Sequence, residues 1–185
     1  MKNTYLTSHF PLIAILLFGL SFAIYIERLA IQYLQEIGLY SGMIEFLSAR
    51  GIDLILLFVL WLFFFMLFAA MKLIAVTVNE LSLLFFSRDQ DGSELKNVRK
   101  GSWIFLIGGI ASVPATFEIF ALLGVFVLTC FIYFIYFIYR VSDSLSAFAL
   151  IGLIFFHLFF WFAFVTVIFY AVVKLYNSII AGLPV

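Results

Sequence analysis

Few side chains of this sequence combine a reactive group with a position inside an apolar segment, and His157 is the foremost of them. It interrupts a run of 30 residues, 144–173, that contains no charged side chain. An ionisable residue in such a run indicates a functional role by default, such as proton relay or substrate contact. The structural alternative is a neutral imidazole that forms a hydrogen bond with a Tyr, Ser or Thr of a neighbouring helix. Because His157 follows Ala147 by about 15 Å of helix, we expect it near the middle of the bilayer.

Three charged residues lie at the ends of apolar runs. Lys72 and Glu80 could form a polar cluster with Asn79 inside the membrane. The apolar run before Lys72 is already about 27 Å long as a helix, so Lys72 is expected to extend to the inner surface and Glu80 to lie among headgroups. Glu118 is expected in a turn at the outer interface, and its functional alternative is an entry point for a cation or proton.

Sequence motifs for catalysis or cofactor binding are absent. The chain contains no HExxH, GxSxG or P-loop pattern and no pair of aspartates within an apolar run. Cys130 is the single cysteine, which excludes an intramolecular disulfide, a CxxC redox pair and a cysteine-based zinc site. The sequence therefore predicts a protein that is not an enzyme and that binds no cofactor.

The elements that carry these residues belong to an integral membrane protein, as the composition shows. Charged residues make up 11% of the chain and hydrophobic residues 66%, whereas soluble domains contain about 25% charged residues. The formal net charge is zero, which leaves no basic surface for a nucleic acid. We therefore expect an all-α polytopic bundle of transmembrane helices, with membrane lipid as a partner.

The lengths of the apolar runs predict about five membrane spans, because one crossing takes about 20 helical residues. The expected spans are residues 10–26, 53–72, 103–117, 119–139 and 147–173. The third span is short and contains Pro114, so it is either half of a hairpin that turns at Phe117 and Glu118 or a shallow re-entrant segment. For the first span, an alternative is a signal peptide that is cleaved after residues 21–23.

Short amphipathic helices are expected at both membrane surfaces. On the outer side, one helix is predicted to begin at residue 27 and stop at Gly38, and a second to run from Ser41 to Gly51. On the inner side, apolar residues recur with helical spacing on one face, while Lys72, Asn79 and Ser82 lie on the other. This pattern predicts an interfacial helix or an extension of the second span. The apolar positions are Ile74, Val78, Leu81 and Phe85.

Small residues mark one face of the third span. Gly108, Ser112 and Thr116 follow one another at intervals of four residues. Such a face allows a neighbouring helix to approach closely, so these three positions are predicted to pack against another helix.

The distribution of basic residues predicts the orientation. With five spans, seven Lys and Arg residues lie on the side of the N-terminus and three on the other side. Basic loop residues concentrate in the cytoplasm. We therefore expect a cytoplasmic N-terminus, a cytoplasmic loop at residues 87–102 and a C-terminus outside the cell.

Four stretches of the sequence together resemble a known family. They are MKNTYLT with FPLIAILLF near the start, NELSLLFFS at 79–87, IGLIFFHLFFWF at 151–162, and LYNSII with LPV at the end. Over its full length the chain resembles the YufK-like family of small integral membrane proteins from Gram-positive bacteria. The resemblance implies a bacterial plasma membrane and assigns no activity and no functional residues.

Three functions are compatible with this sequence. The first is a non-catalytic accessory component that binds lipid, other integral membrane proteins or copies of itself. The second is a small oligomeric permease or channel for an apolar or proton-coupled substrate that uses His157, and the third is a membrane enzyme. Hydrophilic solutes need a polar path, whereas the spans offer little beyond His157 and a few hydroxyl groups. The sequence therefore favours the accessory role.

Overall fold

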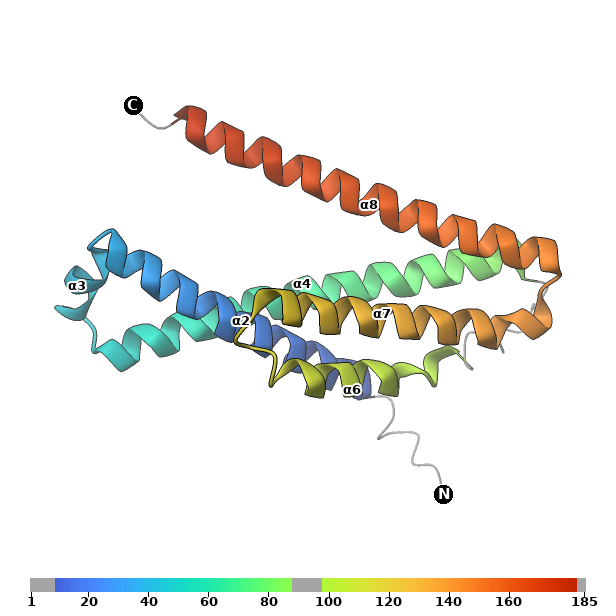
Figure 1. Cartoon of the computed structure of the whole chain (residues 1–185), viewed down its shortest axis with the longest axis horizontal. Helices are drawn as coiled ribbons and strands as arrows, with labels where there is room; N and C mark the ends of the chain where they lie inside the picture. The colour runs from blue at the N-terminus through green and yellow to red at the C-terminus, as the bar shows by residue number, and fades with distance from the viewer. Residues whose placement is uncertain (1–8, 88–97, 183–185) are drawn as a thin grey trace, which may run out of the picture.

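The described part of the chain is α-helical and contains no strand (Figure 1). A computed structural model describes residues 9–87 and 98–182. Four helices, α2, α4, α7 and α8, are long and apolar enough to cross a bilayer, which confirms the predicted all-α polytopic fold. The elements in chain order are α2 (Phe10–Glu36), α3 (Leu39–Ile44), α4 (Ala49–Phe86), α6 (Ser102–Ser112), α7 (Ile119–Val141), η1 (Ser142–Ser144) and α8 (Ala147–Gly182).

Helix α4 is a single helix of 38 residues, about 57 Å long. It joins the predicted second span to the apolar segment at residues 74–85, so the predicted extension of that span is the correct alternative. Of the predicted cytoplasmic loop, residues 88–97 lie outside the described residues. At the other end of α4, the Ser48 side chain accepts a hydrogen bond from the Gly51 N–H at 3.1 Å, so α4 begins at Ala49.

The prediction for the α2–α4 connection is wrong in two respects. Helix α2 continues from the first span to Glu36, so no separate surface helix begins at residue 27. The short helix α3 begins at Leu39 after Gly38, whose φ of 76° is left-handed, and it ends at Ile44. Ser41 donates a hydrogen bond to the Gly38 carbonyl from within α3 and caps no helix. The helix cap is Ser48 instead, because its side chain accepts from one of the unpaired N–H groups at the start of α4.

Helices α6 and α7 form the predicted antiparallel hairpin. Helix α6 has 11 residues, about 16 Å, and a turn at residues 113–118 connects it to α7. A side chain added at Gly101 would meet the Tyr136 ring, and one at Gly108 would meet Thr129. The segment 101–118 therefore lies along the first 18 residues of α7, about 27 Å. Pro114 cannot donate a backbone hydrogen bond, which explains why the regular helix ends earlier than predicted.

Two separate hydrophobic cores hold the helices together. The first joins α2, α4, the α6–α7 turn and α7 through Ile15, Phe18, Phe22, Phe68, Ala115 and Leu122. The second joins the C-terminal ends of α4 and α7 to the start of α8 through Val98, Phe137, Val141 and Leu153, with Phe86 packed against them. Helix α8 contributes only to the second core, and it diverges from α4 toward the C-terminus (Figure 1). This second core lies at the end of the bundle where α7 ends, and Arg140 is in the last turn of α7. We call this end of the bundle the Arg140 end.

Candidate functional site

His157 is buried where α8 meets α4 and α7. Only 2% of its surface is exposed. Its ring lies among three phenylalanine rings: the centroid distances are 5.5 Å to Phe134 and 5.1 Å to Phe137 on α7, and 5.8 Å to Phe156 on α8. The imidazole is therefore enclosed by apolar rings, and its polar atoms must find partners within the protein.

Both ring nitrogens of His157 have such a partner. The Nδ1 atom lies 3.0 Å from the Leu153 carbonyl oxygen, and Nε2 lies 3.1 Å from the Asn79 side-chain oxygen. A carbonyl only accepts, so Nδ1 carries a proton and donates to Leu153. An imidazolium donates from Nε2 to Asn79 as well, whereas a neutral ring accepts there from the Asn79 NH2 group after rotation of the amide. The two arrangements differ by one proton and by the orientation of one amide.

Asn79 is the residue that sequence reasoning did not identify as the partner of His157. The expected partner was a Tyr, Ser or Thr, and Asn79 was expected on the polar side of the segment 74–85, opposite its apolar residues. Instead, Val78 and Ser82 are buried next to Asn79, and the Ser82 hydroxyl donates to the Asn79 carbonyl at 2.8 Å. The apolar residues Leu81 and Phe85 are exposed. In a membrane protein, polar side chains face other helices and apolar ones can face lipid.

The site lies close to the Arg140 end of the bundle. Asn79 follows Phe68 of the first core by 11 residues on α4, about 16 Å. Phe137, against which the imidazole packs, is four residues from the end of α7. The first turns of α8 extend along the last turns of α4 and α7, where Gly152 approaches the Phe86 ring. His157 therefore lies nearer to one end of the bundle than the sequence predicts.

The other charged candidates do not join this site. Lys72 is exposed on α4. Glu80 pairs with Arg99 at 3.5 Å, and both side chains are largely exposed, so this ion pair contributes less than about 1 kcal/mol. Glu118 is exposed in the turn directly before α7, where the sequence predicts it.

The predicted helix-packing residues lie at two different interfaces. Gly108 faces Thr129 on α7. Ser112 faces α2, where its hydroxyl lies 2.9 Å from the Ser21 hydroxyl and donates to the Gly109 carbonyl at 2.7 Å. Thr116 lies beyond the end of α6, and its carbonyl accepts from Arg28 at 3.4 Å. The small residues of α6 thus allow both α2 and α7 to pack closely against its backbone.

Gly109 is a packing residue that the spacing of small residues did not reveal. A side chain there would approach the backbone of Ala14 on α2 at 3.3 Å. The double glycine at 108 and 109 is the signal in the sequence, since adjacent positions on a helix point to different neighbours.

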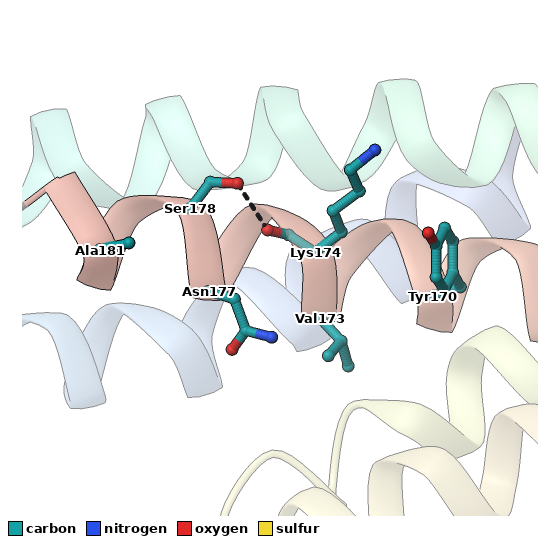
Figure 2. A pocket seen from close by; sticks show the side chains of 6 residues that line it. All are labelled: Tyr170, Val173, Lys174, Asn177, Ser178 and Ala181. Atoms are coloured by element: carbon teal, nitrogen blue, oxygen red, sulfur yellow. Dashed lines mark hydrogen bonds between the residues drawn. The ribbon is translucent and has the colours of Figure 1, made fainter.

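The described residues contain no group of three or more His, Cys, Asp or Glu side chains that could hold a metal ion. A hollow of about 400 Å³ lies far from His157, along one face of the C-terminal part of α8. Figure 2 shows its lining, in which the Ser178 hydroxyl donates to the Lys174 carbonyl at 2.9 Å. Because all six lining residues belong to α8, this hollow is an open surface and not an enclosed binding pocket.

Long apolar helices that surround a few hydrogen-bonded polar groups define a polytopic α-helical membrane protein. The chain is 46% identical to the uncharacterized membrane protein YufK of Bacillus subtilis (strain 168), over the full length of both proteins. A family of unknown function (DUF5366) matches residues 27–184, and the chain belongs to this family. The resemblance found in the sequence is thereby confirmed. No solved structure matches the chain.

Proposed function

We propose that the protein is a non-catalytic accessory component of the bacterial plasma membrane, which binds other integral membrane proteins or further copies of itself. The observation that carries this proposal is the C-terminal half of α8. Residues 165–178 are all exposed, and neither hydrophobic core includes any of them. A helix of this length that its own chain leaves uncovered offers a surface to lipid and to a partner helix.

The placement of polar groups supports an accessory role over transport. Each polar side chain buried in the described part of the chain forms a hydrogen bond within the protein. Ser21 and Ser112 pair between α2 and α6, Thr129 donates to the Val125 carbonyl within α7, and Ser82 and His157 lie at the Arg140 end. A path for a hydrophilic solute needs a continuous row of polar groups. These groups lie in three separate places instead, each with its own hydrogen bonds.

A proton-coupled permease is the second candidate, and the His157 site is the observation that favours it. A titrating side chain needs hydrogen-bond partners in both of its protonation states, and the contacts of His157 with Leu153 and Asn79 can serve in both. The two candidates differ in what they need from His157: the accessory role needs a hydrogen bond, and the permease needs a side chain that titrates.

The accessory role can be tested with a photo-crosslinking amino acid placed in α8 of the full-length protein in its native membrane. We expect the photoactivated group at position 169 to form adducts with protein. The control is position 120 on α7, since Phe169 and Phe120 are similarly exposed, at 69% and 76%. We expect adducts mainly with lipid at position 120. Lipid adducts alone at both positions would contradict the proposal.

We propose that the N-terminus is cytoplasmic and the C-terminus outside, and cysteine labelling tests this orientation. With Cys130 replaced by Ala, an impermeant thiol reagent applied to intact cells is expected to label Ser41→Cys and Gly182→Cys and to leave Asp143→Cys unlabelled. The physical reason is the excess of basic residues in the loops on the Asp143 side. The opposite pattern would reverse the orientation. Labelling at both 41 and 143 would mean that the α6–α7 hairpin supplies one crossing instead of two.

A further inference from the structure

The face of α8 that points away from α4 and α7 has the residue spacing of a coiled coil. An aromatic residue occurs at every seventh position, namely Phe148, Phe155, Phe162, Phe169 and Tyr176. Three residues after each of the first four comes a branched aliphatic residue, namely Ile151, Leu158, Val165 and Val172. All nine side chains are at least 58% exposed. We call these nine residues the α8 seam.

Intervals of three and four residues place the α8 seam on one narrow stripe of the helix. This is the heptad pattern in which side chains of one helix insert between those of a parallel neighbour. The seam extends from Phe148 to Tyr176, about 42 Å of helix. The buried residues Leu153 and His157 lie on the other side of α8, toward the second core. The seam can therefore be covered without disturbing the contacts that hold α8 to its own chain.

Apart from the hydroxyl group of Tyr176, the polar groups of α8 lie off the seam. Lys174 is the single charged residue between positions 147 and 182, and in the heptad it falls at the position farthest from the seam. His157, Asn177 and Ser178 also fall outside the seam and its flanking positions, where Thr166 is the single polar side chain. An uncharged stripe of this length fits an equally long and uncharged partner helix, because a charged side chain facing it within the bilayer would find neither water nor a counter-charge.

We propose that the α8 seam pairs with the same seam of a second copy of this chain. The inference rests on the proposed function and names the partner. Two copies in one membrane have the same orientation, so their α8 helices run parallel and a two-fold axis brings identical residues together. Every aromatic layer then meets its own copy at the same depth, and so does every aliphatic layer. Helix pairs with this spacing pack at a small left-handed crossing angle in membranes.

Cysteine crosslinking of full-length protein in native membranes tests the pairing. Three valines of similar exposure supply a matched set: Val165 and Val172 belong to the seam, and Val167 lies on the opposite side of α8. With Cys130 replaced by Ala, each valine is changed singly to cysteine and a mild oxidant is applied. Seam positions in a parallel pair lie near the roughly 4.4–6.8 Å between Cα atoms that a disulfide requires, so we expect about fivefold or more dimer at 165 and 172 than at 167.

Each other result overturns the pairing. Equal dimer at all three positions would indicate random collision, and absence of dimer at 165 and 172 would indicate that the seam is not paired in this way. If position 165 instead forms a disulfide with a different protein, the second copy is the wrong partner and the accessory role survives. If no dimer forms and the photo-crosslinker at position 169 also reaches lipid alone, both proposals fail.

Discussion

Replacing Gly108 by leucine is expected to destabilise the protein by about 1–3 kcal/mol, because a larger side chain must force apart two helices that touch there. A side chain at this position would meet the Thr129 side chain on α7, and Thr129 is itself held by a hydrogen bond to the Val125 carbonyl at 2.7 Å. The measurement is the thermal unfolding midpoint in a mild detergent, together with the amount of protein in the membrane.

Gly124→Leu is the matched control for Gly108→Leu. Gly124 lies on α7, and a side chain added there would have no neighbour within 4 Å. The control variant gains the same helix-favouring side chain and the same apolar volume without any contact. A Gly108→Leu protein as stable and abundant as Gly124→Leu would contradict the close approach of α6 and α7.

Replacing His157 by leucine is expected to lower stability by about 1–3 kcal/mol, the cost of leaving a partly buried partner without its hydrogen bond. The partner is the Asn79 side chain. Changing both residues to leucine should therefore cost less than the sum of the two single changes. Asn177→Leu is the control, because Asn177 is exposed on the same helix. Additive losses in thermal stability would show that Asn79 and His157 do not depend on each other.

His157→Gln separates the two functional candidates. Glutamine can keep a hydrogen bond to Asn79 but cannot titrate near neutral pH. We expect this variant to accumulate normally and to restore any growth phenotype of a strain that lacks the gene. A variant that is folded and abundant but fails to restore growth would favour the permease, with His157 as its titrating group.

The long helices could be predicted from the sequence because the length of an apolar run is a direct measure of how far it reaches across a bilayer. The hairpin and the stop at Gly38 were equally accessible, although the turn of the hairpin begins directly after Ser112 and not at Phe117. The start of α4 was not, because Ser41 and Ser48 are both acceptable helix caps. Which serine caps α4 depends on where that helix begins in the folded protein, and it begins at Ala49, directly after Ser48.

The candidate site was predicted in part. His157 could be found from its isolation in an apolar run, but Asn79 could not be recognised as its partner. The apolar stripe at residues 74–85 was interpreted as the face of an interfacial helix or of an extension of the second span. The structure leaves Leu81 and Phe85 of this stripe exposed but buries Val78. Where lipid is the solvent, apolar periodicity does not distinguish the face toward protein from the face toward solvent. The buried Ser82 on the same helix shows that the polar side of this segment faces the neighbouring helices.

The length of α4 has a consequence for where the membrane lies along it. Its uncharged run from Leu54 to Met71 is about 27 Å of helix, close to a hydrocarbon core of about 30 Å, and the exposed charged residues Lys72 and Glu80 follow this run. The last turns of α4 are therefore expected at the level of the headgroups and beyond them. This part of α4 carries Asn79, so the hydrogen bond between Asn79 and His157 is expected near one surface of the bilayer, where the dielectric constant changes steeply with depth.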